Sequence, residues 1–192
     1  MRHEDIMLIL AFLAAYLIGS INSAIIVSKI MLHDDIRKYG SGNAGATNAL
    51  RTLGKKGAIP VVIGDLLKAV IAILFAKLIC SDSSLAVYIA GIGVVLGHNF
   101  PIYFGFRGGK GVATLVGAVT GIYPPVALLC FGVWFVMLMV SHYVSLSSMV
   151  AGCCFPVFTL ISPKVNGSTP FVVFSFVIAV LLIYTHRKNI ER

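Results

Sequence analysis

Seven apolar runs occupy most of this 192-residue chain, and their lengths limit what it can fold into. A bilayer has a hydrocarbon core about 30 Å thick, which a helix of roughly 20 apolar residues crosses. Apolar residues make up 58% of the chain and charged residues only 11%, too little polar surface to cover a soluble globule. The runs lie at about Ile6–Ile30, Ile59–Ile79, Leu85–Phe100, Val112–Tyr123, Val126–Tyr143, Leu146–Ile161 and Phe171–Tyr184.

These runs predict an all-α, polytopic bundle of about seven transmembrane spans. Only helices and closed β-barrels satisfy every backbone group in lipid, and the alternating pattern of barrel strands is not visible in the sequence. The fourth run is the weakest, because Gly117, Gly121 and the pair Pro124-Pro125 shorten it, and we expect a half-length or tilted helix there. The length leaves no room for a soluble domain, so we expect one domain over residues 1–192.

Basic residues collect in three of the joints and predict the orientation of the chain. Lys and Arg accumulate on the cytoplasmic side of a membrane, so we expect the N-terminus outside and the C-terminus in the cytoplasm. The same cytoplasmic excess of Lys and Arg explains much of the net charge of +8, so this charge gives no reason to expect nucleic-acid binding. These basic residues are Arg37, Lys38, Arg51, Lys55 and Lys56, then Arg107 and Lys110, then Arg187, Lys188 and Arg192.

The first basic joint is also rich in glycine and in small polar residues. Glycines 42 and 45 free the backbone, so N–H groups and side chains together can hold a phosphate. Arg51 adds a planar fork that matches two phosphate oxygens. An ordinary loop with a positive-inside arginine remains the alternative. The expected donors are Ser41, Asn43, Thr47, Asn48 and Arg51.

The second basic joint ends a span at His98, turns at Pro101 and is expected to open the next helix at Lys110. A helix N-terminus attracts anions, and Gly108 and Gly109 allow close approach of the backbone to such a ligand. The spacing is not that of a Walker A loop, which argues against a nucleotide site.

The third basic joint closes the last span. His186 and Asn189 are three residues apart, with Arg192 three further on, and on a helix they would share one face. A basic tail that anchors the helix at the lipid surface is the alternative. Asp65 and Lys68 also share a helical face inside the second run; we expect a structural ion pair or a support for the pocket, because unpaired charges are costly in lipid.

Together the three joints resemble the bacterial membrane acyl-phosphate:glycerol-3-phosphate acyltransferases. The resemblance rests on Gly-Ser-Gly-Asn-x-Gly-Ala-Thr-Asn-x-x-Arg at residues 40–51 and on His-Arg-x-Asn-Ile-x-Arg at 186–192. Between them stands Gly-His-x-Phe-Pro-x-x-x-x-Phe-x-Gly-Gly-Lys-Gly-Val-Ala-Thr at 97–114. Length, span layout and motif order agree over nearly the whole chain.

The resemblance implies transfer of a fatty acyl group from acyl phosphate to the 1-hydroxyl of sn-glycerol 3-phosphate, which yields lysophosphatidic acid and phosphate. It implies a multi-pass enzyme of the bacterial inner membrane with a cytoplasmic active site, without cofactor or obligatory protein partner. We also expect no metal, because no carboxylate or His/Cys group with ligand spacing lies among these motifs. The stretch around Ser145 and Ser148 also looks like a family feature, although the family more often has a basic residue in place of His142. The implied catalytic residues are Lys110, His186 and Asn189, and the implied substrate-binding residues are Ser41, Asn43, Thr47, Arg51, Gly108, Gly109, Lys110, Ser145, Ser148, His186, Asn189 and Arg192.

Acyl phosphate is a mixed anhydride whose phosphate leaves readily, so positioning and charge stabilisation are expected to supply most of the rate. We expect a substrate phosphate, rather than a protein base, to accept the hydroxyl proton. The alternative function is a phosphate or organic-anion transporter with broken helices. A partial sequence similarity between residues 42–47 and 109–114 supports this alternative.

Overall fold

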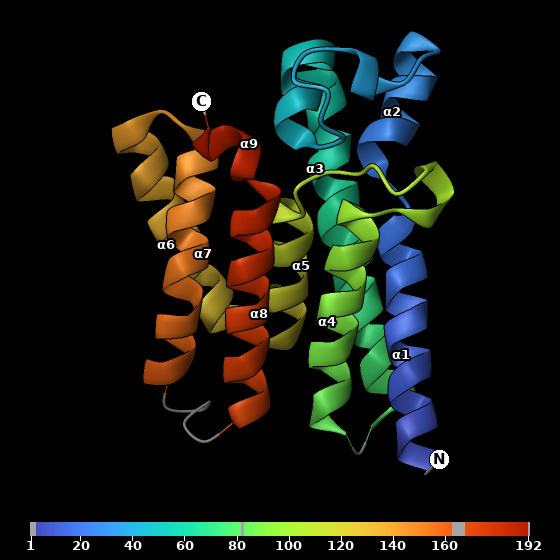
Figure 1. Cartoon of the computed structure of the whole chain (residues 1–192), viewed down its shortest axis with the longest axis vertical. Coiled ribbons are helices and arrows are strands. Elements are labelled where there is room, and N and C mark those ends of the chain that lie inside the picture. The colour runs from blue at the N-terminus through green and yellow to red at the C-terminus, as the bar shows by residue number, and fades with distance from the viewer. Residues whose placement is uncertain (1–2, 82, 163–167, 192) are drawn as a thin grey trace. The chain divides into compact units, whose positions relative to one another are not determined.

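The computed structural model describes residues 3–81, 83–162 and 168–191, and within these ranges the chain is helical and has no strand (Figure 1). The helices form two compact units, Met1–Ala118 and Val119–Arg192. The predicted all-α membrane fold is therefore confirmed. The single domain over residues 1–192 stays a prediction.

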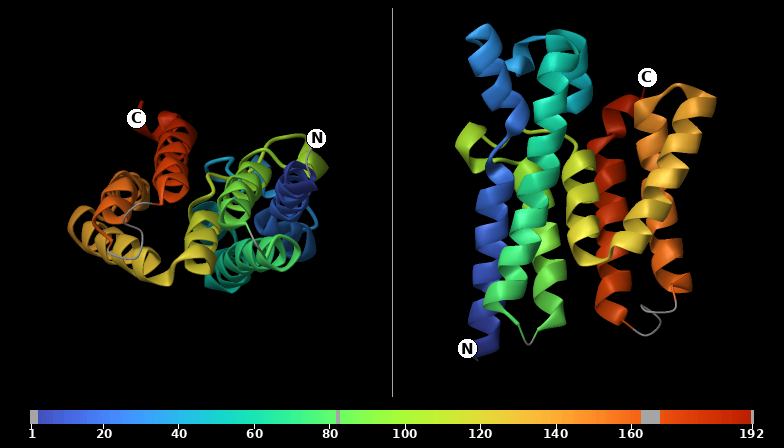
Figure 2. Two further views of the ribbon diagram at one scale, coloured as in Figure 1. Left: turned by 90° about the horizontal axis from the view of Figure 1, so that it is seen from below. Right: turned by 180° about the vertical axis from the view of Figure 1, so that it is seen from behind.

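In the first unit, α1, α3 and α4 pack side by side (Figures 1 and 2). Both glycine-rich segments of this unit lie toward the end opposite the N-terminus. The elements are α1 (His3–Ser20), α2 (Ser23–Leu32), η1 (Ile36–Lys38), α3 (Ala46–Ile79), α4 (Ser84–Asn99), η2 (Ile102–Phe104) and α5 (Val112–Ile122), of which α5 continues past the boundary at Ala118.

The first apolar run is not one helix, as the sequence predicts, but two. Asn22 stands between α1 and α2, and its side chain accepts a hydrogen bond from the N–H of Ile25 at 3.1 Å. An asparagine in this position offers the backbone an alternative to the continuous helix and starts a new one. At the break, the carbonyl of Ile21 accepts a hydrogen bond from Lys68 of α3 at 2.9 Å.

The second run is longer than predicted, because α3 begins at Ala46 rather than at Ile59. Gly54 interrupts it with φ 70° and ψ −169°, a conformation that residues with a side chain rarely adopt. The glycine thus divides α3 into a short helix, which carries Thr47 and Arg51, and the membrane-spanning helix that follows.

Helices α1 and α4 approach closely because glycines line their contact. A methyl group on Gly97 would collide with the carbonyl oxygen of Tyr16, and one on Gly93 would lie 2.7 Å from that of Phe12. Small residues four apart are a common helix–helix contact in membranes, where packing rather than water expulsion drives association. This contact positions His98, one residue beyond Gly97.

In the second unit, α7 packs against both α6 and α8. The rings of Phe155, Phe171 and Phe174 pack together, with centroids 5.9–6.3 Å apart. The hydroxyls of Thr159 and Ser175 are 3.1 Å apart and join α7 to α8. The elements are α6 (Pro124–Ser141), α7 (Val144–Ile161), α8 (Thr169–Thr185) and α9 (Arg187–Ile190).

Five helical stretches in the described residues are long and apolar enough to cross a membrane, and two apolar helices are shorter. The shorter ones are α5 and α8, so the weak fourth run does form a short helix. The two ends of each later run agree with the helix ends to within a few residues, because the hydrophobic length decides them. The number of crossings and the orientation stay predictions.

Candidate active site

The first glycine-rich segment, residues 40–45, is held in place by Asn48. The side-chain oxygen of Asn48 accepts a hydrogen bond from the N–H of Ser41 at 2.8 Å. Its side-chain nitrogen donates to the carbonyls of Tyr39 and Ile36, at 3.1 and 3.3 Å. The prediction that Asn48 is a phosphate donor is therefore wrong for this arrangement, because its amide shapes the segment instead.

The predicted phosphate ligands of this segment surround the start of α3. Gly45 caps the helix, Thr47 and Arg51 lie on its first two turns, and both side chains are exposed. Ser41 is also exposed and Asn43 is half-buried. The first N–H groups of a helix lack intrahelical acceptors and carry a partial positive charge, so this helix start suits an anion.

The second segment folds back on the end of α4. The N–H of Gly108 donates to the carbonyl of Asn99 at 3.1 Å, and that of Gly109 donates to the carbonyl of His98 at 3.2 Å. A methyl group on Gly108 would collide with the carbonyl oxygen of His98. These two N–H groups are therefore occupied inside the protein, and the glycines permit a close backbone contact. Their assignment to substrate binding stays a prediction.

The two segments meet at Gly109. A methyl group there would collide with the imidazole of His98 and lie 2.6 Å from the carbonyl oxygen of Ala44. Asn22, at the break between α1 and α2, donates its side-chain N–H to the same carbonyl at 3.2 Å. Residues 22, 44, 98 and 109 thus bring the two predicted anion-binding segments into contact.

Lys110 follows this contact directly and is half-buried. The sequence places the helix start at Lys110, but α5 begins at Val112, because Gly111 has φ 79° and only its carbonyl accepts the first helical bond, from Leu115. Lys110 therefore precedes the helix start. Near it, the buried side chains of Asn99 and Thr114 have no hydrogen-bond partner within the described part of the chain.

A buried cluster of charges lies behind the second segment. The ammonium of Lys68 is 2.8 Å from the carboxylate of Asp65, 2.9 Å from Nδ1 of His98 and 2.9 Å from the carbonyl of Ile21. The hydroxyl of Ser23 donates to the same carboxylate at 2.9 Å. The ammonium has three N–H donors and three acceptors around it, so it is satisfied in the low-dielectric interior. The predicted ion pair is confirmed, and the ring of His98 contacts both of its members.

In the second unit, Ser148 joins two helices. Its hydroxyl donates to the carbonyl of Val144 at 2.8 Å and accepts from the indole N–H of Trp134 at 3.2 Å. Ser145 is half-buried one turn earlier. The hydroxyl hydrogen of Ser148 is therefore used within the protein, and the substrate-binding roles of both serines stay predictions.

The third segment does not continue α8 as a regular helix. His186 has φ −96° and ψ 2° and separates α8 from α9, of which it is the N-cap residue. The shared face of His186 and Asn189 stays a prediction. The imidazole Nδ1 of His186 is 2.8 Å from the carbonyl of Leu182, and the side chain is buried. Asn189 is half-buried. The predicted ligand Arg192 lies outside the described residues.

A family model described as glycerol-3-phosphate acyltransferase matches residues 9–192, which include all three segments. The chain belongs to this family.

Members of the glycerol-3-phosphate acyltransferase family from several bacteria cover nearly the whole chain. The protein from Thermoanaerobacter sp. strain X514 is 45% identical over 184 residues, which are 96% of this chain and 90% of that protein. The one from Clostridioides difficile strain 630 is 44% identical over 188 residues, with the same two shares. The one from Coxiella burnetii strain CbuG_Q212 is 40% identical over 184 residues, 96% of this chain and 93% of that protein.

Crystal structures of a family member show the same fold. The integral membrane glycerol 3-phosphate acyltransferase PlsY (YgiH) in its glycerol 3-phosphate form matches with a TM-score of 0.88 and 39% identity. Its lysophosphatidic acid form matches with a TM-score of 0.86 and 38% identity. Both matches cover 96% of this chain and 90% of that one. The acyltransferase family resemblance predicted from the motifs is confirmed.

The sequence motifs did not identify the residues that hold the two segments together. Asn22 and Arg37, whose guanidinium donates to the carbonyls of Phe104 and Arg107, lie outside the glycine-rich strings, and His98 stands inside a motif without an assigned role. A polar residue inside an apolar run, such as Asn22, is the one signal that marks such a position, because lipid tolerates it only with a partner.

Proposed function

We propose that this chain transfers a fatty acyl group from acyl phosphate to the 1-hydroxyl of sn-glycerol 3-phosphate. The observation that carries the proposal is the contact at Gly109 and Ala44, which joins the segment with Ser41, directly before the helix start that carries Arg51, to the segment with Lys110. Membership of an acyltransferase family favours this enzyme over the alternative of an anion transporter. The products are lysophosphatidic acid and inorganic phosphate.

In the proposed reaction, the 1-hydroxyl oxygen attacks the acyl carbonyl carbon, and the bond between that carbon and the phosphate oxygen breaks. Lys110 and Arg51 stabilise the negative charge that develops on the phosphate and the carbonyl oxygen. His186 and Asn189 orient the glycerol backbone. A substrate phosphate accepts the hydroxyl proton. An ionisation in the pH–rate profile that disappears in His186→Ala would contradict this last assignment.

The proposed reaction is tested by comparing two acyl donors, acyl phosphate and acyl-CoA. Purified protein in detergent is expected to release phosphate and form lysophosphatidic acid when it receives acyl phosphate and glycerol 3-phosphate. With acyl-CoA as the donor we expect no product above background, because the proposed leaving group is phosphate. Absence of turnover with acyl phosphate, or equal turnover with acyl-CoA, would refute the proposed donor.

The contact between the two segments also predicts the effect of a single methyl group. Gly109→Ala is expected to lower kcat/KM by roughly one to two orders of magnitude, because overpacking at a close contact costs about 1–3 kcal/mol. The methyl group would push the backbone next to Lys110 away from His98 and Ala44.

Gly132→Ala in α6 is the matched control, because a methyl group there meets nothing within 4 Å. Its turnover is expected to stay within about twofold of the parent enzyme. If Gly109→Ala behaves like this control, the contact does not set the geometry of the site.

A further inference from the structure

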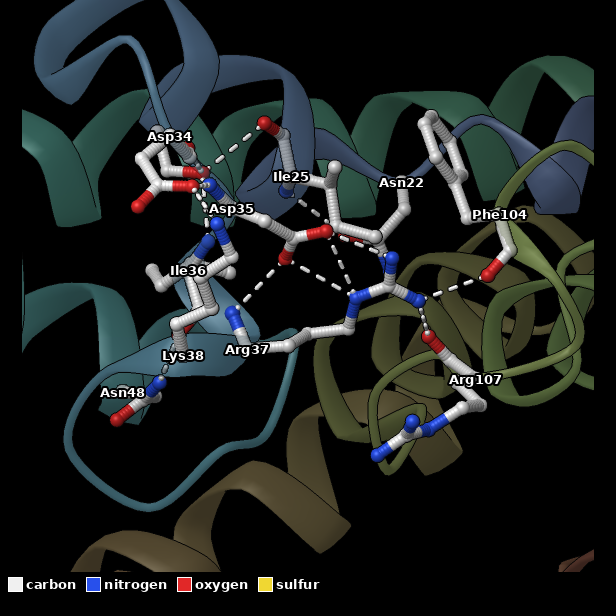
Figure 3. Close-up of polar contacts among 11 residues, drawn as sticks. Asn22, Ile25, Asp34, Asp35, Ile36, Arg37, Lys38, Asn48, Phe104 and Arg107 are labelled. Carbon is white, nitrogen blue, oxygen red and sulfur yellow. Dashed lines mark hydrogen bonds and ion pairs between the residues drawn. The ribbon is translucent and has the colours of Figure 1, made fainter.

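The side chain of Arg37 connects the first glycine-rich joint to the second (Figure 3). Its Nη1 donates to two main-chain carbonyls, that of Phe104 at 2.7 Å and that of Arg107 at 2.8 Å. Its Nε and Nη2 donate to the carboxylate of Asp35 at 2.7–3.1 Å. One side of the guanidinium therefore binds the carboxylate of Asp35, and the other side binds the loop of residues 100–109.

The base of this connection is itself fixed. Ile36 is fully buried, and its N–H donates to the hydroxyl of Ser28 in α2 at 3.0 Å. Asp35 caps the short helix η1 by accepting a hydrogen bond from the N–H of Arg37 at 2.9 Å. Arg37 thus projects from a backbone with few ways to move, and its planar fork loses little freedom when it binds the loop.

The loop of residues 100–109 is closed by its own main chain. The N–H groups of Phe104 and Phe106 donate to the carbonyl of Pro101 at 3.1 and 2.9 Å, and Gly108 and Gly109 pair with the end of α4. Lys110 follows the last of these bonds. The two carbonyls that Arg37 holds belong to Phe104, in the turn that begins at Pro101, and to Arg107, next to the pairing with α4, so the guanidinium links these two parts of the loop.

We propose that Arg37 is a positioning residue, which holds the 100–109 loop against η1 so that Lys110 is presented to the phosphate group of a substrate. The catalytic consequence rests on the proposed acyltransferase function. The structural consequence, an ordered loop, does not depend on it. Lysine cannot replace arginine here, because one ammonium cannot reach the carboxylate in two places and both carbonyls at once.

The neighbouring pair of Asp34 and Lys38 is a matched control. Lys38 is 2.6 Å from Asp34, but its side chain is 68% exposed, whereas that of Arg37 is 22% exposed. The hydrogen bond from Lys38 is the main cause that lowers the pKa of Asp34 to about 2, and that from Arg37 lowers the pKa of Asp35. Both carboxylates are ionised at neutral pH, so the two ion pairs are alike in charge. They differ because Arg37 also donates to the carbonyls of Phe104 and Arg107.

The test compares Arg37→Gln, Arg37→Lys and Lys38→Gln by amide hydrogen exchange and by turnover. In both Arg37 variants we expect exchange at Phe104, Phe106, Gly108 and Gly109 to rise at least about tenfold, with the spanning part of α4 unchanged. We expect kcat/KM for glycerol 3-phosphate to fall by about tenfold or more. Lys38→Gln is expected to match the parent enzyme within about twofold in both measurements.

Parent-like exchange in Arg37→Gln would overturn the proposal, as would full rescue of exchange and turnover by Arg37→Lys, since charge alone would then suffice. Equal effects of Lys38→Gln would overturn it too. Increased exchange throughout α1, α3 and α4 would assign Arg37 to general stability instead. If the parent enzyme turns over no acyl phosphate while the exchange pattern holds, the donor assignment fails and the role of Arg37 in the loop stands.

Discussion

Replacement of Lys110 with methionine is expected to lower kcat/KM for glycerol 3-phosphate by about 10²–10³-fold. Lys110 stands two residues before α5, between the close contact at Gly109 and the left-handed backbone of Gly111. A fixed ammonium stabilises charge that develops on phosphate more effectively than water does, because it needs no reorganisation. Turnover of the purified variant, with both substrates varied, measures the effect.

The control for this variant is Lys56→Met, which removes another lysine from the same unit. Lys56 is exposed on α3, and its charge has the ordinary role of a basic residue near a membrane surface. We expect activity within about twofold of the parent enzyme. A Lys110→Met enzyme that keeps more than about a tenth of the parent activity would contradict the role proposed for this lysine.

The second large effect concerns stability rather than catalysis. Lys68→Met is expected to lower the free energy of unfolding by about 3–5 kcal/mol, because it leaves the carboxylate of Asp65 buried without its cation. Asp65 and Lys68 are both buried and 2.8 Å apart, and the same ammonium holds the carbonyl of Ile21 and the ring of His98. Thermal unfolding in detergent measures the loss.

A double variant separates the buried charge from the packing of the side chains. Asp65→Asn combined with Lys68→Met removes both charges, and we expect it to be less destabilised than Lys68→Met alone. Lys56→Met again serves as the exposed control. Equal unfolding midpoints for Lys68→Met and the parent protein would show that the ammonium does not balance Asp65.

The expected effects of the Lys110 and Lys68 variants distinguish two roles within the first unit, one in catalysis and one in stability. Lys110 lies where the loop leads into α5, and its loss is expected to leave the fold intact. Lys68 lies in the membrane-spanning part of α3 and connects the break at Ile21 with His98, against which Gly109 packs. Its loss is expected to disturb both stability and the placement of the second segment. Measurements of unfolding and turnover on the same samples separate these contributions.

Much of the helical layout is predictable from sequence, because apolar length decides it. The runs from Leu85 onward coincide with α4 to α8 to within a few residues. The prediction fails where a single residue changes the backbone: Asn22 breaks the first run, and Gly54 divides α3, the helix that contains the second run. The first run continues on both sides of Asn22, and Gly54 lies in a polar stretch before the second run, so the lengths of the apolar runs mark neither break. The side-chain cap at Asn22 and the positive φ at Gly54 each change the backbone at a single residue.

The candidate site divides in the same way. The glycine-rich strings and their basic residues identified Ser41, Arg51 and Lys110 as candidates, because an anion requires such groups wherever the chain places them. The strings did not show that Asn48 is committed to the carbonyls of Tyr39 and Ile36. Whether an amide faces a ligand or its own backbone depends on the fold of the turn, which the residue type leaves open.

The sequence by itself determined that the chain is an all-helical membrane protein with three basic segments of an acyltransferase family, two of them rich in glycine. Bilayer thickness requires long apolar runs, and the charge of phosphate requires basic residues. Both can be recognised in the sequence without knowledge of the fold. Only the tertiary structure decided that Arg37 holds the carbonyls of Phe104 and Arg107, and that Lys68 holds that of Ile21. Main-chain carbonyls are the same in every residue, so only their positions in space select these partners.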